Sequence, residues 1–396
     1  MKIGIQSFNY APHDLGGSER SARDLAIGLA ARGHDIRVVL SDGSKPYPDT
    51  QDGIPLDVVQ GLPIGKSPLH GARNFSTRMA WNLRSEVDPV LFARVVRWLR
   101  NHCPDVVLMN NPAGHGTAML AACRLTGTPV LPVIRDYGWF CAHGVMMRGD
   151  SPCTRLCGRC VVFSSARRRL LKPLPRVVAI SEYVAGLYRD VLGTDNTEVI
   201  YNAVPERFLN TPRPTPRPAD APLNFGYLGR LHPTKGVGEL VEAWQVSGVA
   251  MQGHRLLLGG DNVGVTLPKN AADLGIDVLG RQDAISFLDR LDALFLPALW
   301  AEPFGRTVIE ALARGLFVIG SPNGGIPELV PEDCGLIPER IDVASLTVVL
   351  QELVADPARV RRTRETDPVP ALERFRNARL IDAYENILLK TAGFAQ

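Results

Sequence analysis

The sequence predicts two α/β domains, each built on a parallel β-sheet that helices cover on both faces. Short apolar strands alternate with helical patterns in both halves of the chain, which is typical of parallel sheets. A segment with five prolines in thirteen residues, 210–222, separates the halves, and proline disfavours both helices and central strands. The chain has 396 residues and is 45% hydrophobic, which is enough for more than one buried core.

The predicted elements follow one another in the order of an α/β protein. The first half opens with a strand at 3–8 and a helix that has Ser18 as its N-cap and ends before Gly33. Further strands are predicted at 36–40, 105–109, 130–134, 177–180 and 198–201, and, after the proline-rich segment, at 224–228, 255–259, 276–280, 293–297, 317–320 and 334–337. We therefore expect an N-terminal domain over 1–205 and a C-terminal domain over 206–373, with a last helix at about 374–396 that packs back on the first domain.

Charge and composition exclude several classes of protein. The net charge of +3 lacks the strong basic excess of nucleic-acid-binding proteins. No apolar stretch approaches the ~20 residues of a membrane-spanning helix, and the start MKIGIQSFNY is typical of a strand, not of a signal peptide. We expect a cytoplasmic protein. The basic segment SSARRRLLK, with Arg167–Arg169, is either a solvated helix face or a peripheral contact of the N-terminal domain with the inner face of the membrane.

Two cations follow the strand predicted at 224–228. In GYLGRLHPTKG the loop after this strand carries Arg230 and Lys235, and Gly236 opens a helix. Ligands of α/β proteins bind at the carboxyl ends of parallel strands, and arginine and lysine both bind phosphate. The segment therefore predicts a phosphate-binding loop, and a solvated loop with two surface cations is the alternative.

Two carboxylates, Glu302 and Glu310, flank a helix start in WAEPFGRTVIEALARG. If the helix begins near Arg306, the amides of its first turn are available to an anion. Carboxylates beside an anion are costly unless they accept hydrogen bonds, and the hydroxyl groups of a sugar would donate them. The alternative is that Glu310 only complements the helix dipole.

Glycine pairs follow a strand in each half, Gly16-Gly17 in the first and Gly324-Gly325 in the second. Glycine lets the backbone approach a ligand closely, although a plain turn between a strand and a helix explains each pair equally well. The dinucleotide-binding pattern G-x-G-x-x-G is absent from the first pair.

In their order along the chain, these motifs resemble those of the family-four retaining glycosyltransferases, which have the GT-B fold. The resemblance is carried by Gly16-Gly17, VIYNAVP, YLGRLHPTKG, LGG, EPFGRTVIEA and NGGIPE, and it covers nearly the whole chain, most densely over 177–330. It implies two Rossmann-like domains with parallel sheets that face a central cleft. A nucleotide-diphosphate sugar would bind mostly to the C-terminal domain, and the acceptor would bind to the N-terminal domain.

The resemblance also implies roles for individual residues. Arg230, Lys235 and Glu302 would be catalytic: the two cations would stabilise the diphosphate as the glycosidic bond breaks, and Glu302 would hold hydroxyls of the transferred sugar. Glu310 would accept hydrogen bonds from the ribose. The other donor-binding residues implied are Gly16, Gly17, Arg135, Arg281, Phe304, Gly305, Thr307 and Val308, the last two through their amides.

The implied reaction moves a sugar, with retention, from a nucleotide-diphosphate donor to a hydroxyl of a glycan, a lipid-linked or a small-molecule acceptor. Uridine is the commonest base in the family. No D-x-D sequence occurs, so no metal or other cofactor is expected for catalysis. A nucleotide-sugar epimerase, a phosphorylase-like enzyme and a non-catalytic nucleotide-sugar-binding subunit are the alternatives on the same scaffold.

One position departs from the family pattern. After the strand at 130–134 many members carry a histidine that touches the donor sugar, and Arg135 takes its place here. Arginine hydrogen-bonds a sugar or a phosphate but does not change its charge near neutral pH. His115, after a neighbouring strand, either faces the cleft or is a loop histidine with satisfied hydrogen bonds.

Four of the seven cysteines cluster in the sequence, namely Cys141, Cys153, Cys157 and Cys160. Cys-x2-Cys spacing suits tetrahedral zinc, and four thiolates would complete a structural zinc site. Reduced, packed cysteines and a redox-sensitive loop are the alternatives.

Overall fold

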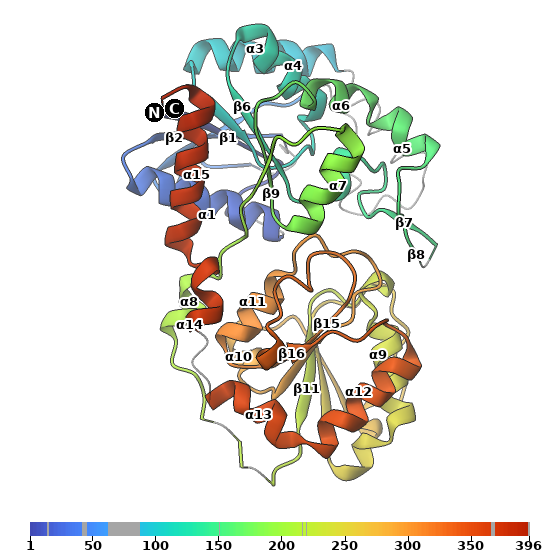
Figure 1. Cartoon of the computed structure of the whole chain (residues 1–396). Helices are drawn as coiled ribbons and strands as arrows, with labels where there is room; N and C mark the ends of the chain where they lie inside the picture. The colour runs from blue at the N-terminus through green and yellow to red at the C-terminus, as the bar shows by residue number, and fades with distance from the viewer. Residues whose placement is uncertain are drawn as a thin grey trace. The chain divides into compact units, whose positions relative to one another are not determined.

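The computed structural model describes residues 1–13, 16–41, 46–61, 88–149, 151–215, 217–218, 220–365 and 369–394, which form two compact units (Figure 1). The first unit comprises Met1–Met146, Cys153–Tyr201 and Leu380–Gln396, and the second comprises Met147–Pro152 and Asn202–Arg379. Each unit is built on a mainly parallel sheet with helices around it. The predicted α/β class is therefore confirmed.

The sheet of the first unit has eight strands in the order β10-β9-β6-β5-β1-β2-β4-β3. Only the pairing of β3 with β4 is antiparallel. The strands are β1 (Lys2–Ser7), β2 (Asp35–Leu40), β3 (Thr50–Gln51), β4 (Ile54–Val58), β5 (Val106–Met109), β6 (Val130–Ile134), β9 (Val177–Ala179) and β10 (Thr197–Val199). The sequence prediction omits β3 and β4, because these segments are short and Pro55 and Asp57 interrupt their apolar pattern.

The helices of the first unit cover both faces of this sheet. They are α1 (Gly17–Ala31), α3 (Pro89–His102), α4 (Gly116–Thr126), the 3-10 turn η2 (Tyr137–Trp139), α5 (Gly158–Phe163), α6 (Ser165–Leu171), α7 (Glu182–Leu192) and α15 (Asn377–Ala392). The C-terminal helix α15 packs on α1, where a Cβ on Gly28 would lie 2.4 Å from Cδ1 of Ile381. Arg32 of α1's C-terminal end forms ion pairs with Asp382 and Glu385 of α15, which fixes the two helices together.

The predicted N-cap of α1 is wrong. Gly16 occupies this position without a side-chain capping bond, and Ser18 lies inside the helix. The Ser18 hydroxyl instead accepts hydrogen bonds from the side-chain amides of Asn110 (3.0 Å) and Asn111 (3.1 Å), which follow β5. The hydroxyl therefore ties the glycine turn at the start of α1 to the carboxyl end of β5.

The second unit has a six-stranded, fully parallel sheet in the order β13-β12-β11-β14-β15-β16. Its strands are β11 (Asn224–Leu228), β12 (Arg255–Gly259), β13 (Ile276–Gly280), β14 (Ala293–Leu296), β15 (Phe317–Gly320) and β16 (Gly335–Leu336). A short hairpin, β7 (Met147–Arg148) and β8 (Ser151–Pro152), also belongs to this unit. The sequence prediction places all six sheet strands within a few residues and omits the hairpin.

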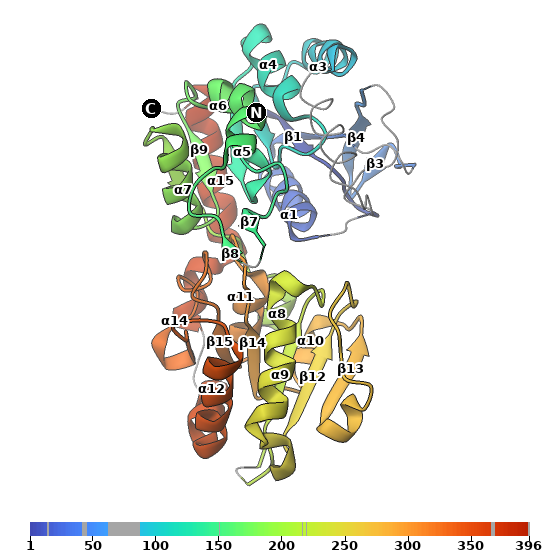
Figure 2. The same ribbon diagram turned by 90° about the vertical axis from the view of Figure 1, so that its right-hand side faces the viewer.

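The core of the second unit lies between its sheet and two helices, α9 (Val237–Ser247) and α12 (Val343–Ala355), which Figure 2 shows side by side. Trp244 of α9 and Leu350 of α12 are fully buried there. The remaining helices are α8 (Glu206–Asn210), α10 (Ala284–Leu288), α11 (Arg306–Ala313), α13 (Pro357–Glu365) and α14 (Val369–Leu372). The 3-10 turns are η3 (Pro233–Lys235), η4 (Val249–Gln252), η5 (Ala271–Leu274), η6 (Glu332–Cys334) and η7 (Glu373–Phe375).

The proline-rich segment is attached to the second unit and does not mark the division between the units, which falls after Tyr201. Arg314, at the end of α11, has no exposed surface. Its guanidinium donates to the carbonyl oxygens of Thr211 and Pro212, both at 2.7 Å, and pairs with Asp289 at 2.7 Å. A buried arginine that satisfies these carbonyls holds the start of the segment against the domain.

His115 is fully buried at the start of α4. Its Nε2–H donates to the carbonyl oxygen of Val59 at 2.7 Å, whereas Nδ1 has no hydrogen-bond partner among the described residues. Burial lowers the pKa of this histidine from 6.5 to about 4, with the Val59 hydrogen bond acting weakly in the opposite direction. The ring is therefore neutral in the folded protein at neutral pH.

This pKa predicts a loss of stability in mild acid. Between pH 6.5 and about 4 the unfolded chain binds a proton at His115 that the folded chain does not. The free energy of unfolding therefore decreases as the pH is lowered, by up to about 3 kcal/mol. Urea unfolding of the parent and of His115→Gln at pH 7 and pH 4.5 measures this difference. The parent should lose more stability than the variant over that interval, and equal losses would contradict the assignment.

Candidate active site

A pocket of about 160 Å³ in the second unit brings together five of the residues predicted for donor binding and catalysis. It lies at the carboxyl ends of β11 and β14 and at the first residues of α11. The predicted residues in its wall are Arg230, Lys235, Glu302, Gly305 and Thr307. The wall also includes Arg306, so the pocket combines three cationic residues, one carboxylate and a helix N-terminus, which are groups that suit a phosphate with attached hydroxyls.

Lys235 and Glu302 form the centre of this pocket. The Nζ of Lys235 makes an ion pair with Oε2 of Glu302, and both side chains are about one-fifth exposed. Trp300 donates a hydrogen bond from Nε1 to the same carboxylate oxygen at 3.0 Å, and its ring centroid lies 4.6 Å from the ammonium. The ammonium and carboxylate are thus held at fixed positions while they remain accessible to a ligand.

Trp300 has no role in the sequence prediction. The sequence does associate Trp300 with the site, because it lies only two positions before Glu302 in the same motif. An aromatic ring has many packing roles in a core, so its contact with Lys235, 65 positions away, cannot be inferred from spacing alone.

Backbone contacts hold the loops of Lys235 and Glu302 together. The carbonyl oxygen of Thr234 accepts hydrogen bonds from the amides of Leu299 (3.0 Å) and Trp300 (3.2 Å). On the other side of Glu302, its carbonyl oxygen accepts a hydrogen bond from the Gly325 amide at 2.8 Å. Gly324 has φ +81°, and a Cβ there would lie 2.3 Å from the same oxygen. The NGG motif therefore serves to position Glu302.

Arg230 is exposed near the start of the loop that carries Lys235. Its carbonyl oxygen accepts a hydrogen bond from the Tyr227 hydroxyl at 2.9 Å. Burial raises the pKa of Tyr227 above its usual value, and the nearby Glu302 carboxylate adds to the effect, so the phenol stays protonated and keeps donating. Burial and the charges of Arg230 and Lys235 lower the pKa of His232, which keeps this loop histidine neutral at neutral pH.

The first turn of α11 begins at Arg306, as the sequence predicts. Thr307 lines the pocket, but the predicted free amide of Val308 is wrong, because this amide donates to the carbonyl oxygen of Gly305 at 2.9 Å. A glycine N-cap with φ +96° allows the tight turn that makes this bond. The start of α11 therefore offers one fewer amide to an anion than the sequence predicts.

Three further residues of the second unit that were predicted to bind the donor lie outside the wall of this pocket, and their donor contacts stay predictions. Phe304 is buried, with its ring perpendicular to that of Phe375 at a centroid distance of 6.2 Å. Glu310 is buried one turn into α11, at 8% exposure. Arg281 follows β13 with 83% of its side chain exposed, and its nearest carboxylate is Asp261 at 4.0 Å.

The predicted donor-binding residues of the first unit lie at the carboxyl end of its sheet. Gly16 and Gly17 form the start of α1. Arg135 is 7% exposed after β6; its Nε donates to Oδ1 of Asn110 at 2.6 Å, and one terminal nitrogen donates to the Tyr384 hydroxyl at 3.3 Å. These contacts connect β6, β5 and α15, so Arg135 has a structural role that the sequence does not indicate. Its contact with the donor stays a prediction.

The four cysteines do not fit a four-thiolate zinc site. Cys141 and Cys160 are buried, and the thiol of Cys160 hydrogen-bonds with those of Cys141 and Cys157. Burial raises the pKa of Cys160 to about 12. Within the described ranges, no group of three or more His, Cys, Asp or Glu side chains is placed to hold a metal ion. None of the seven cysteines forms a disulfide.

The basic segment Arg167–Arg169 does not form a uniformly solvated face. Arg167 is buried, donates to the carbonyl oxygen of Gly138 and lies over the Phe163 ring at 4.9 Å. Arg168 donates to the carbonyl oxygen of Val161 at 2.9 Å. Arg169 alone of the three is exposed, so this segment offers little charge to a membrane. Among the helices that the structure describes, none has the length and apolar content needed to cross a bilayer.

Comparisons with known proteins identify the family of the chain. The family described as Glycosyltransferase Family 4 matches residues 15–208, and the family described as Glycosyl transferases group 1 matches residues 222–356. A GDP-mannose-dependent alpha-mannosyltransferase of Mycolicibacterium smegmatis is 26% identical over 91% of this chain and 90% of its own. An uncharacterized 42.6 kDa protein in the cps region of Klebsiella pneumoniae is 25% identical over 83% of this chain and 87% of its own.

A solved structure shows the same fold. Anabaena Alr3699/HepE in complex with UDP superposes with a TM-score of 0.71 at 19% identity, covering 98% of this chain and 100% of its own. The two family models together span both units, and the relatives align over most of their length. With its two Rossmann-like units of the GT-B fold, the chain belongs to the family-four glycosyltransferases.

Proposed function

We propose that the chain is a retaining, metal-independent glycosyltransferase that moves a sugar from a UDP-sugar donor to a hydroxyl of a glycan, lipid-linked or small-molecule acceptor. The observation that carries the proposal is the pocket in which Arg230, Lys235, Glu302 and the start of α11 come together. Two cations and a helix N-terminus suit a diphosphate, and the carboxylate suits sugar hydroxyls. The UDP complex of the related fold supports uridine as the base.

The pocket residues have distinct tasks in this mechanism. The bond between the anomeric carbon and the diphosphate oxygen breaks, and its electron pair stays on the diphosphate. Lys235 and Arg230 stabilise that charge as it develops, and the amide of Thr307 adds a donor. Glu302 accepts hydrogen bonds from hydroxyls of the sugar. The acceptor hydroxyl attacks the same face and gives its proton to the leaving phosphate oxygen, which retains the anomeric configuration.

The ion pair between Lys235 and Glu302 prepares these tasks. The carboxylate of Glu302 holds the ammonium of Lys235 beside the Trp300 ring, so Lys235 does not have to be ordered when the donor binds. The resident cations also make a bridging divalent metal unnecessary for charge neutralisation in this proposal. The absence of a D-x-D sequence is consistent with that role for the cations.

Thermal shift with nucleotides tests the donor assignment. UDP and UDP-sugars should raise the melting temperature, because a ligand at a hundredfold its Kd stabilises the folded protein by ~2.7 kcal/mol. The variants Lys235→Ala and Glu310→Ala should each lose most of that shift, whereas Lys269→Ala, an exposed lysine outside the pocket wall, should keep it. A larger shift with GDP than with UDP would mean that the donor contains guanosine and not uridine. No shift with any nucleotide would overturn the proposal.

The stereochemistry and metal independence have a separate test. With an α-linked UDP-sugar and an accepted hydroxyl compound, the product should be the α-glycoside, identified by its anomeric coupling constant in proton NMR. Turnover in excess EDTA should equal turnover with added magnesium within about twofold, because resident cations stabilise the leaving group. A β-linked product would refute retention, and loss of turnover in EDTA would refute metal independence.

A further inference from the structure

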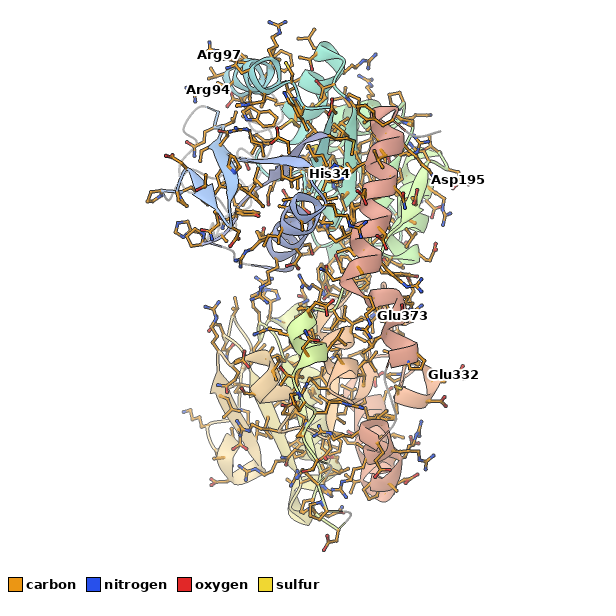
Figure 3. The ribbon with its side chains drawn as sticks, turned by 90° about the vertical axis from the view of Figure 1, so that its left-hand side faces the viewer. His34, Arg94, Arg97, Asp195, Glu332 and Glu373 are labelled. Carbon is orange, nitrogen blue, oxygen red and sulfur yellow. The ribbon has the colours of Figure 1, made fainter. Side chains whose placement is uncertain are left out.

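One outer surface of the first unit is rich in arginine. Arg94, Arg97 and Arg100 recur at every third position of α3, and Arg124 lies near the end of α4, which packs against α3. All four are exposed, and we call them the arginine face. Figure 3 shows Arg94 and Arg97 at the outer side of α3. The opposite side of α3 is buried in the core through residues such as Val95 and Leu99, so the helix presents this row outward.

The arginine face carries little compensating charge. Neither α3 nor α4 contains an aspartate or glutamate. The side chains of Arg97 and Arg100 make no hydrogen bond or ion pair with the residues that the structure describes, whereas Arg94 donates to the carbonyl oxygen of Gln60 at 2.8 Å. Elsewhere on the molecule exposed arginines often have carboxylate partners, as Arg23 does with Asp52 and Arg255 with Asp277. The guanidinium groups of Arg97 and Arg100 are therefore available to an anion from outside.

An apolar depression lies directly among these guanidinium groups. A groove of about 430 Å³ is lined by Phe92, Ala93, Val96, Arg97, Arg100, Asn101 and Leu125. Leu125 is 61% exposed, which is unusual for a leucine that has a helix partner nearby. The surface thus alternates cationic groups with apolar ones within the span of two helices.

We propose that the arginine face and its groove bind the surface of a membrane that contains anionic lipids. Arg97 and Arg100 contact lipid phosphates, for which the planar guanidinium is well suited, while Leu125 and Phe92 contact the upper part of the acyl chains. Arginines near an anionic bilayer act together with an apolar anchor, and this combination supports reversible peripheral binding. A nucleic acid would use the same cations but has no use for an exposed leucine beside them.

This surface differs from the one that the sequence indicates. The segment Arg167–Arg169 has consecutive arginines, yet two of them bond to carbonyl oxygens of their own unit. Arg97 and Arg100 are separated in the sequence by apolar core residues and give no charge run. The spacing of three along α3 brings them to one side of the helix.

Vesicle co-sedimentation tests the proposal. The full chain should sediment with vesicles of phosphatidylglycerol and phosphatidylcholine, remain in solution with pure phosphatidylcholine, and dissociate as salt is raised. Arg97→Glu/Arg100→Glu should weaken binding at least tenfold. Lys269→Glu/Arg290→Glu makes the same change in net charge at exposed positions of the second unit and should bind like the parent. Leu125→Ser, which leaves the charge unchanged, should weaken binding measurably.

The outcomes of this experiment distinguish membrane binding from nucleic-acid binding and from an effect of net charge. Equal loss of binding in both double variants means that only net charge matters and overturns the proposal. Loss of oligonucleotide binding in Arg97→Glu/Arg100→Glu, with vesicle binding retained, assigns the face to a nucleic acid and also overturns it. Circular dichroism of each variant must match the parent. If Arg97→Glu/Arg100→Glu does not fold, Arg97→Gln/Arg100→Gln provides the same comparison with a smaller perturbation.

Discussion

Replacing Lys235 with alanine is expected to lower kcat for donor turnover by about 10²–10³-fold, with a smaller change in KM. The ammonium lies in the pocket wall at the carboxyl end of β11, where the proposed reaction leaves charge on the diphosphate. A fixed donor that faces charge developing in the transition state affects kcat more than ground-state binding. Release of nucleoside diphosphate from a nucleotide sugar, followed by a coupled assay or by chromatography, measures both parameters.

Because Lys235 is ion-paired with Glu302, a second variant is needed to interpret the effect of Lys235→Ala. Lys235→Ala alone leaves the Glu302 carboxylate with the Trp300 indole N–H as a partner but without its cation. Lys235→Ala/Glu302→Gln removes that unpaired charge as well. Because Glu302 has its own role in holding the sugar, the single variant Glu302→Gln is the reference. If Lys235 acts on the diphosphate, the double variant should regain stability but turn over the donor more slowly than Glu302→Gln. If the double variant turns over the donor as fast as Glu302→Gln, Lys235 serves only to neutralise Glu302, and the catalytic role is refuted. Lys269→Ala is the matched control and should have parental kinetics.

The sequence predicts those parts of the fold and site that depend on local pattern. The strands of the second unit are short apolar runs between glycines, and they appear within a few residues of their predicted positions. Arg230 and Lys235 follow one strand, and Gly305 precedes a helix, so their place at the carboxyl edge of a parallel sheet follows from topology alone. Only the resemblance placed Lys235 and Glu302 at one site, because 67 positions separate them, and their ion pair was not predicted.

The parts that the sequence does not predict depend on long-range contacts. The sequence does not indicate the role of Arg314, because its guanidinium bonds to the carbonyl oxygens of Thr211 and Pro212 and every residue has a carbonyl oxygen. Ser18 is a good N-cap residue by type, but two asparagine amides following β5 use its hydroxyl instead. The amide of Val308 was expected to meet an anion, and the conformation of Gly305 gives it a partner inside the loop. Backbone partners of this kind have no signature in residue type.

Replacing Gly236 with alanine is expected to destabilise the second unit by about 2–5 kcal/mol and to abolish most donor turnover. Gly236 has φ +68°, and a Cβ there would lie 1.7 Å from the carbonyl oxygen of Pro297. The left-handed conformation costs alanine about 1–2 kcal/mol, and relief of the clash adds about 1–3 kcal/mol. The clash is with backbone, so no side-chain rotation relieves it, and the loop that carries Lys235 must separate from the one that carries Glu302.

Gly238→Ala provides the matched control for this prediction. Gly238 lies in the first turn of α9, two positions later, and no described atom lies within 4 Å of the place its Cβ would take. Alanine there should stabilise the protein by roughly 0.5–1 kcal/mol through its better helix propensity and leave turnover unchanged. Urea unfolding and the donor-turnover assay on both variants decide the matter. If Gly236→Ala matches Gly238→Ala in both measurements, close backbone contact does not hold Lys235 in place, and the pocket tolerates independent motion of its two loops.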